Sequence, residues 1–233
     1  MKVFFDMDGT LARFYDDPNA LDRMWEPGYF KGLKPYQNMI DAIKKLNTVP
    51  GLELYILSAT TTENEYSEKF EWINKYLPGI FGYHQIGFVS PRTVKAEHVK
   101  AKFGDDLAKA ILIDDYNKNL NAWKEHGGTA VKFVNEINDK GTNGPLWPGE
   151  RVSFTDTVDD IVDKIMAIAF SSPAEVVFDV TFTRKERIKV EVPADMVQNA
   201  DQLMAYLQSL DLKTLISSEG DNITIQTDSV AVL

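Results

Sequence analysis

The alternation of short apolar runs with segments of helical periodicity constrains the fold of this 233-residue chain more than any other feature. Such alternation is typical of a parallel sheet with helices on its faces. The runs that predict strands are KVFFD (2–6), ELYILS (53–58), HQIGFVS (84–90), KAILIDD (109–115) and TAVKFV (129–134). The segments that predict helices are 35–46, 62–79, 116–128 and 155–170. The sequence therefore predicts an α/β domain over residues 1–171.

Two of the predicted helices carry clear local signals. The helix over 62–79 begins with Thr62 followed by Glu65, a capping-box pattern, and stops at Pro78-Gly79. The helix over 35–46 places four apolar side chains on one stripe at helical spacing, namely Met39, Ile40, Ile43 and Leu46. Each helix therefore has an apolar face to bury against the sheet.

The pattern changes after SSPAE (171–175). Strand-like alternation occupies 175–183 and 187–193, a helical pattern follows over 193–210, and residues 222–233 predict one or two further strands. The sequence therefore predicts a small, separate α+β unit over 172–233. No catalytic constellation is visible in this unit. It could be a protein-binding module or an oligomerisation module, and its role stays open.

Composition excludes several functional classes. The chain has no cysteine, which excludes disulfides, thiol catalysis and thiolate metal sites, and its three histidines are scattered. The net charge of -10 argues against binding to nucleic-acid polymers or to an anionic membrane. No run approaches the ~20 apolar residues that span a bilayer, and acidic residues interrupt the amino-terminal segment where a signal peptide is apolar. We expect a soluble, cytoplasmic protein, and the sequence leaves a homodimer open.

The string DMDGT (Asp6 to Thr10) directly follows the first apolar run. Residues two apart in a strand point the same way, so Asp6 and Asp8 should lie on one side of the strand end. Neighbouring carboxylates disfavour each other's ionisation, so this pairing is costly unless a cation or a reaction needs it. Gly9 permits a tight turn or close approach to a ligand. An ordinary Asp-Gly turn is the alternative.

Three further polar features fall at, or just before, strand ends. Ser58 ends the second predicted strand and precedes a helix, where an anion can bind, although an ordinary strand-to-helix loop is the alternative. Asp114-Asp115 ends the apolar run AILI, a costly position unless a cation binds there, and hard oxygen ligands suit magnesium. A pocket shared by phosphate and carboxylates also needs a cation, for which Lys95, Lys100 and Lys102 compete.

The order DMDGT, serine, lysine, DD closely resembles the haloacid dehalogenase superfamily of phosphotransferases. The resemblance covers residues 1–170 and implies a Rossmann-like core. The segment over residues 14–34 is similar to the small cap of the 5'(3')-deoxyribonucleotidases, since PGYFKGLKP (27–35) matches their P-x-(Y/F)-F-x-x-L-x-P pattern. The run DDYNKNLNAW and the later NEIN also resemble that family. One departure is DGT in place of the DGV of many relatives.

The resemblance implies a magnesium-dependent phosphomonoester hydrolase. Asp6 would attack phosphorus and form an aspartyl-phosphate, and Asp8 would protonate the leaving oxygen and then activate water. Magnesium would be held by Asp6, the backbone carbonyl of Asp8 and the DD motif, with Asp114 favoured over Asp115 as the direct ligand. The phosphate would be bound by Ser58, Gly9, Thr10 and a lysine, for which Lys95 is favoured over Lys100.

The substrate implied by the finer resemblance is a nucleoside monophosphate. Cap aromatics could stack on its base or pack the cap on the core, and both readings stay open for Phe14, Tyr29 and Phe30. Base, sugar and the choice between 5' and 3' phosphate are not fixed by the sequence. The alternatives are a phosphatase of another small phosphate ester, a metal-binding regulator, and a protein that acts through its carboxyl-terminal unit.

Overall fold

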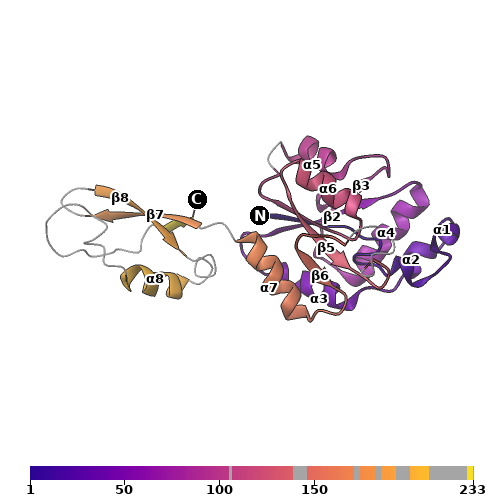
Figure 1. The fold of residues 1–233 in the computed structure, drawn as a ribbon, viewed down its shortest axis with the longest axis horizontal. Helices are drawn as coiled ribbons and strands as arrows, with labels where there is room; N and C mark the ends of the chain where they lie inside the picture. The colour runs from indigo at the N-terminus through magenta and orange to yellow at the C-terminus, as the bar shows by residue number, and fades with distance from the viewer. Residues whose placement is uncertain are drawn as a thin grey trace. The chain divides into compact units, whose positions relative to one another are not determined.

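The computed structural model describes residues 1–104, 107–138, 146–170, 174–181, 185–192, 200–209 and 230–232. The chain divides into two compact units, Met1–Lys164 and Ile165–Leu233, and this division falls within helix α7 (Val158–Ala169). The predicted boundary at 171–172 lies outside the described residues and stays a prediction. Figure 1 labels the helices and strands of each unit, which are described separately below.

The first unit is built on a six-stranded sheet in the order β3-β2-β1-β4-β5-β6, and every neighbouring pair is parallel. This arrangement confirms the predicted α/β class. The strands are β1 (Lys2–Phe5), β2 (Glu53–Ala59), β3 (Ile86–Val89), β4 (Ala110–Asp114), β5 (Thr129–Val134) and β6 (Arg151–Ser153). The prediction missed β6, because three residues are too few to show strand alternation. It also extended β3 too far, since residues 84 and 85 belong to a short 3-10 helix, η2 (Tyr83–Gln85).

The chain runs outward from β1 to β2 and β3, and then crosses to β4 and onward to β6. The direction of winding therefore changes between β1 and β4. In open parallel sheets, ligands bind beyond the carboxyl ends of the strands at such a switch point. This position lies directly after Phe5 and at Asp114, which are the ends of β1 and β4.

The helices that connect these strands are α3 (Gln37–Leu46), α4 (Glu63–Tyr76), α5 (Lys95–Phe103) and α6 (Asn117–Glu125). The predicted helices over 35–46, 62–79, 116–128 and 155–170 are confirmed as α3, α4, α6 and α7, with ends that differ by up to three residues. One half of the predicted capping box is present, since the Thr62 side chain accepts a hydrogen bond from the backbone amide of Glu65. The Glu65 carboxylate accepts from Thr61 instead of from the Thr62 amide. Helix α5 was not predicted, because its buried apolar residues are only Ala96 and Val99.

Alternation along the strands supplies apolar side chains to both faces of the sheet. On one face, Phe4, Leu57 and Leu112 belong to a buried cluster with Val99 of α5 and Trp123 of α6. In Figure 1, α5 and α6 lie on one side of the sheet and α3 on the other. Burial of each large apolar side chain contributes roughly 1.5–3 kcal/mol, so the two faces together account for most of the stability of the core.

The small helical segment predicted after the first strand is present between β1 and α3. It consists of a 3-10 helix, η1 (Phe14–Asp16), and the short helices α1 (Ala20–Arg23) and α2 (Tyr29–Gly32). We call residues 14–34 the cap. The buried Glu68 of α4 accepts a hydrogen bond from the backbone amide of Gly28 at 2.5 Å and one from Phe30 at 3.0 Å. The cap is therefore anchored to a core helix.

The second unit contains β7 (Ala174–Thr181), β8 (Lys185–Val192), β9 (Val230–Val232) and α8 (Ala200–Ser209). The three strands form an antiparallel sheet in the order β8-β7-β9. This agrees with the predicted small α+β composition. Residues 193–199 of the predicted helix, and most of the predicted strand region over 222–233, lie outside the described residues.

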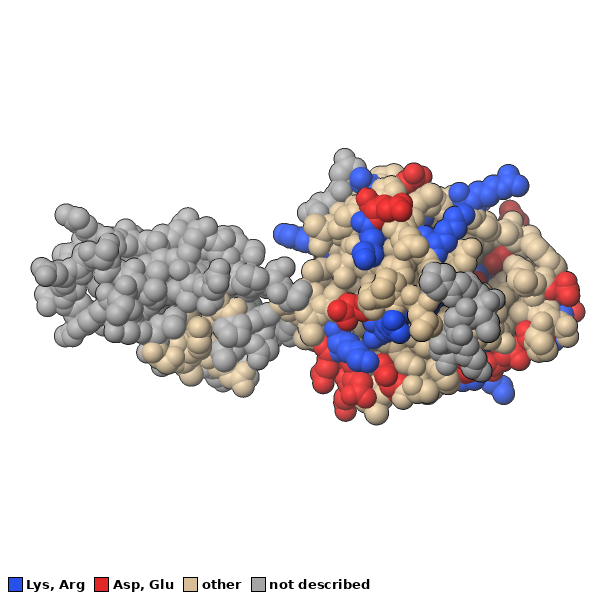
Figure 2. Space-filling model, in the orientation of Figure 1, with Lys and Arg blue, Asp and Glu red and all other residues tan. Residues whose placement is uncertain are grey.

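On the face of the first unit drawn in Figure 2, lysine and arginine side chains are interspersed with aspartate and glutamate. Ion pairs on the exposed surface of this unit include Lys45 with Asp159 at 2.6 Å and Lys164 with Asp156 at 2.8 Å. In the part of the chain that the structure describes, no helix combines the length and apolar character required for a membrane span.

Candidate active site

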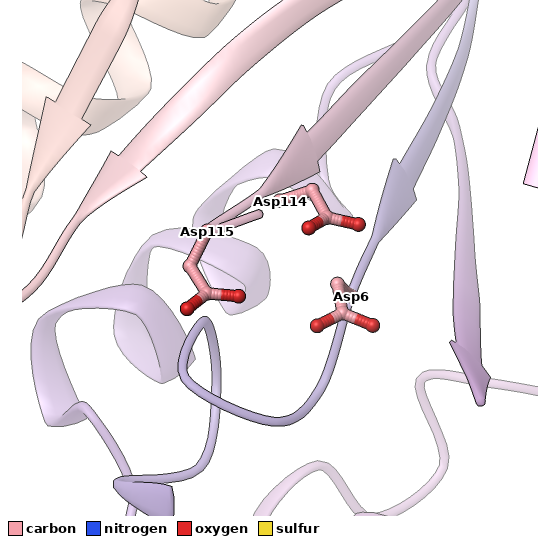
Figure 3. A group of neighbouring side chains, drawn as sticks. All are labelled: Asp6, Asp114 and Asp115. Atoms are coloured by element: carbon pink, nitrogen blue, oxygen red, sulfur yellow. The ribbon is translucent and has the colours of Figure 1, made fainter. Parts of the chain in front are cut away.

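Three buried carboxylates meet at the switch point of the sheet: Asp6 after β1, Asp114 at the end of β4, and Asp115 next in sequence. One oxygen from each lies within 4.8 Å of the others. The register explains the juxtaposition, because Phe5 pairs with Ile113 and the backbone amide of Asp6 donates to the carbonyl of Ile113 at 2.9 Å. Figure 3 shows the three carboxyl groups grouped at these strand ends.

This carboxylate cluster is electrostatically costly on its own. Burial, together with Asp114 and Asp8, raises the pKa of Asp6 to about 7, although Lys95 acts in the opposite direction. Burial, followed by the charges of Asp114 and Asp6, raises the pKa of Asp115 well above its ordinary value. A divalent cation would offset this repulsion. An all-oxygen donor set fits a hard ion such as magnesium, so the residues present suit the metal that the sequence predicts.

Lys95 supplies a cation within this cluster. Its Nζ atom donates to Asp6 Oδ1 at 2.5 Å and to Asp114 Oδ2 at 2.7 Å, and the side chain is buried. Lys95 is the first residue of α5, whereas Lys100 lies in the last turn of that helix. Of these two lysines, the structure thus brings Lys95 to the carboxylates. Its role toward phosphate stays a prediction.

The two candidate metal ligands of the DD motif differ in their hydrogen bonding. Asp114 accepts hydrogen bonds from Lys95, from Asn119 at 2.9 Å and from the backbone amide of Tyr116 at 2.8 Å. Asp115 Oδ2 accepts from Asn135 at 3.2 Å. Both side chains remain within the cluster, and the preference for Asp114 as the direct ligand stays a prediction.

Asp8 and Ser58 share a partner that the sequence analysis missed, Lys69. The Nζ atom of Lys69 lies 2.5 Å from Asp8 Oδ2 and 3.4 Å from Ser58 Oγ, and it also pairs with Glu65 at 2.8 Å. Burial would lower the pKa of Lys69, but the carboxylates of Asp8 and Glu65 raise it, so the side chain stays cationic. Lys69 lies three residues before Trp72 on the buried stripe of α4, but this stripe also contains Glu65 and Glu68, so the sequence alone does not show that Lys69 is buried.

Position 9 requires glycine for two reasons: the backbone there is left-handed, and the side chain of Asp115 lies close to it. Its φ of +77° is left-handed, and a Cβ atom there would lie 2.5 Å from Asp115 Oδ2. The amide of Gly9 donates to the carbonyl of Ala12 at 2.8 Å, and that of Thr10 donates to Met7 at 3.2 Å. Both amides are therefore engaged by the turn itself, and phosphate binding by Gly9 and Thr10 stays a prediction.

Comparison with known proteins bears on the fold. No protein-family model and no curated protein matches the sequence. Among solved structures, D,D-heptose 1,7-bisphosphate phosphatase from Burkholderia thailandensis superposes with a TM-score of 0.50 at 13% identity, covering 71% of this chain and 98% of that one. A haloacid dehalogenase-like family hydrolase from Streptococcus pneumoniae gives 0.50 at 13% identity, covering 70% and 97%. The chain contains a haloacid dehalogenase-like fold.

Within the haloacid dehalogenase-like core, two asparagines hold the carboxylate cluster in place. The buried Asn135 donates to the carbonyl of Gly9 at 2.9 Å and to Asp115 Oδ2. Asn138 Nδ2 donates to the carbonyl of Asp115 at 3.3 Å, and its Oδ1 accepts from the amide of Asn135 at 2.9 Å. In the sequence these residues stand out only as part of the NEIN string. The structure shows that they tie the turn after β1 to the end of β4.

The cap aromatics fall into two groups by exposure. Phe14 and Phe30 are buried and stack on each other with ring centroids 6.1 Å apart, as expected if they pack the cap. Tyr29 is half-buried, and Tyr15, which was not a candidate, is 38% exposed beside Gly9. Base recognition by Phe14, Tyr29 and Phe30 stays a prediction.

Proposed function

We propose that this protein is a magnesium-dependent phosphomonoester hydrolase. The observation that carries this proposal is the carboxylate cluster at the switch point, with Asp6 bound to Lys95 and with Asp8 turned toward a second lysine. A nucleophile needs one carboxylate and proton transfer needs another, and DMDGT supplies both from one strand end. The haloacid dehalogenase-like fold is consistent with this chemistry.

The reaction that we propose has two steps. In the first, a carboxylate oxygen of Asp6 forms a bond to phosphorus, the ester P–O bond breaks, and its electron pair remains on the leaving oxygen, which takes a proton from Asp8. In the second, Asp8 accepts a proton from water as that water attacks phosphorus and releases Asp6. Asp6, the backbone carbonyl of Asp8, and Asp114 or Asp115 would hold magnesium, which when bound neutralises charge on the phosphoryl group.

Lys95 and Ser58 have separate tasks in this proposal. Lys95 favours the ionised form of Asp6 and orients it, and it offers positive charge to the phosphate once the substrate is bound. Ser58 donates a hydrogen bond from its hydroxyl group to a phosphate oxygen. Ser58 lies at the end of β2, and Lys95 is the first residue of α5, the helix that follows β3. Both residues are therefore at the edge of the sheet where the strands end.

The substrate class that we propose is a nucleoside monophosphate, as in the 5'(3')-deoxyribonucleotidases. The support is the cap of about 20 residues, its PGYFKGLKP motif, and the DDYNKNLNAW run. A second class, other small phosphate esters, uses the same catalytic residues and differs only in what the cap admits.

A substrate panel tests this proposal. Phosphate release is measured from ribo- and deoxyribonucleoside 5'- and 3'-monophosphates and from small sugar phosphates, with magnesium and with a chelator, for the wild type and Asp6→Asn. Magnesium-dependent release from nucleotides, abolished by Asp6→Asn, is the expected result. Phosphate release from sugar phosphates alone would show that the substrate is another small phosphate ester and not a nucleoside monophosphate. Absence of release from every ester, with magnesium still bound, would overturn the enzymatic proposal.

A further inference from the structure

The ammonium group of Lys69 lies completely buried between two carboxylates, which is unusual for lysine. It donates to Asp8 Oδ2 at 2.5 Å and to the carbonyl of Ala59 at 2.5 Å, and it pairs with Glu65 Oε1 at 2.8 Å. Buried ion pairs pay a desolvation cost that often equals their attraction, so stability alone does not explain this one. A positioning role accounts for it better.

The contact with Lys69 makes the two oxygens of Asp8 inequivalent. Oδ2 is held by Lys69, whereas Oδ1 is buried and has no hydrogen-bond partner in the described part of the chain. Leaving a buried acceptor without a partner is costly, so such a group calls for an explanation. The geometry leaves Oδ1 for a group that does not belong to the protein.

Lys69 is itself fixed from several sides. Glu65 lies one helical turn before it on α4, and Glu65 Oε2 accepts from both the amide and the hydroxyl of Thr61 at 2.7 Å. The ring of Phe30, from the cap, lies over the ammonium with 4.6 Å between Nζ and the ring centroid. A cation enclosed in this way has little freedom to rotate, so it can define the orientation of its partner carboxylate.

We propose that Lys69 is a positioning residue that orients Asp8, so that Asp8 Oδ1 faces the leaving oxygen of the substrate. This assignment rests on the proposed phosphate hydrolysis. In the first step, the proton moves from Asp8 Oδ1 to the leaving oxygen as the P–O bond breaks, while Lys69 remains bound to Oδ2 throughout. Lys69 transfers no proton, and Phe30 holds it from the cap side.

The dependence of rate on the leaving group distinguishes positioning from a merely structural role. An alkyl phosphate releases a strongly basic oxygen and needs proton donation, whereas an aryl phosphate such as p-nitrophenyl phosphate releases a stable anion and needs little. We would measure kcat/KM for a nucleoside monophosphate and for p-nitrophenyl phosphate in the wild type, Lys69→Met and Asp8→Asn. The matched control is Lys75→Met, an exposed lysine of the same helix.

We expect Asp8→Asn to lower kcat/KM for the alkyl ester by about 10²–10⁴ and Lys69→Met to lower it by about tenfold or more. The aryl ester should be affected much less, and Lys75→Met should match the wild type on both. If Lys69→Met fails to fold, Glu65→Gln serves in its place, because it removes a charge that holds the Lys69 ammonium in position. It should lower kcat/KM less than Lys69→Met, and again more for the alkyl ester than for the aryl ester. Equal losses on both esters in the folded variants would overturn the proposal.

A crystal structure of Lys69→Met, or of Glu65→Gln in its place, provides a readout independent of turnover. The carboxylate of Asp8 should rotate away from its wild-type orientation, and an unchanged Asp8 would overturn the proposal. If the wild type hydrolyses neither ester, the proposed function fails, and the orientation of Asp8 still decides whether Lys69 positions it.

Discussion

The side chain of Asn135 donates a hydrogen bond of 2.9 Å to the backbone carbonyl of Gly9, a residue 126 positions away in the sequence. The same Nδ2 atom reaches Asp115 Oδ2 at 3.2 Å. One buried amide therefore fixes the turn that follows β1 relative to the carboxylate that follows β4. The distance between Asp6 and Asp115, and hence the fit of a cation, depends on this link.

Asn135→Ala should both destabilise the chain and weaken magnesium binding. The substitution removes the donor that the buried Gly9 carbonyl and the Asp115 carboxylate share, which costs about 1–3 kcal/mol. Urea unfolding and calorimetric magnesium titration measure the two effects. The control is Asn74→Ala, an exposed asparagine that bonds within α4, and wild-type magnesium affinity in Asn135→Ala would contradict the prediction.

Gly9→Ala should abolish magnesium binding, whereas Gly79→Ala should not. Both glycines have left-handed φ values, +77° and +73°, so both substitutions cost about 1–2 kcal/mol of backbone strain. Only at Gly9 does the added Cβ meet Asp115 Oδ2, at 2.5 Å, while nothing lies within 4 Å at Gly79. The Tm should fall in both variants and further in Gly9→Ala, because of the contact with Asp115. Equal magnesium affinities in the two variants would refute the role of close approach.

Lys95→Met should lower phosphate release by about 100-fold or more, because it removes the charge that contacts Asp6 and that we propose to bind the substrate phosphate. Lys100→Met should stay within about twofold of the wild type, since Lys100 is half-buried in the last turn of the same helix, away from the carboxylate contacts of Lys95. Steady-state kinetics on both variants decide between the two lysines. Comparable losses of activity in the two variants would show that the contacts of Lys95 with the carboxylates do not give it a special role in the reaction.

Glu68 should make the anchoring of the cap sensitive to acid. Burial would raise its pKa, but hydrogen bonds from Gly28, Asn64 and Phe30 hold the pKa below its ordinary value of 4.5. A carboxyl whose pKa is depressed on folding stabilises the chain above that ordinary value, and the contribution is lost as the pH falls through the folded-state pKa. The difference in Tm between wild type and Glu68→Gln should therefore be largest at neutral pH and shrink in acid.

The control for this experiment is Glu71→Gln on the same helix. Glu71 is exposed and lies 3.7 Å from Lys31, so its substitution should shift Tm little at any pH. A Tm difference for Glu68→Gln that stayed constant with pH would mean that its charge contributes nothing to the anchor.

The parallel α/β class and most of its strands and helices were predictable because the signals were local. Apolar runs such as ELYILS, and caps such as Thr62 with Glu65, act over a few residues. The convergence of Asp6 with Asp114 followed from the rule that parallel strands end at the same edge of a sheet. Strand β6 and helix α5 were missed because one is too short and the other has too narrow an apolar stripe for periodicity to show.

The buried supports of the site were not predictable in the same way. Lys69 and Glu65 are spaced as an ordinary surface pair, and sequence spacing alone does not reveal that both are buried. Asn135 finds its partner across more than half of the chain, and only tertiary structure brings them together. The exposure of cap aromatics was likewise undetermined, since a stacking ring and a packing ring look alike in sequence.

The anchor at Glu68 also makes any opening of the cap measurable. The backbone amides of Gly28 and Phe30 donate to this one carboxylate, so neither can exchange its hydrogen with solvent while the cap stays on α4. Hydrogen exchange at these two amides therefore reports the free energy of separating the cap from the core. If the cap opens to admit substrate, the two amides will exchange together, and faster than the amides in the middle of α4.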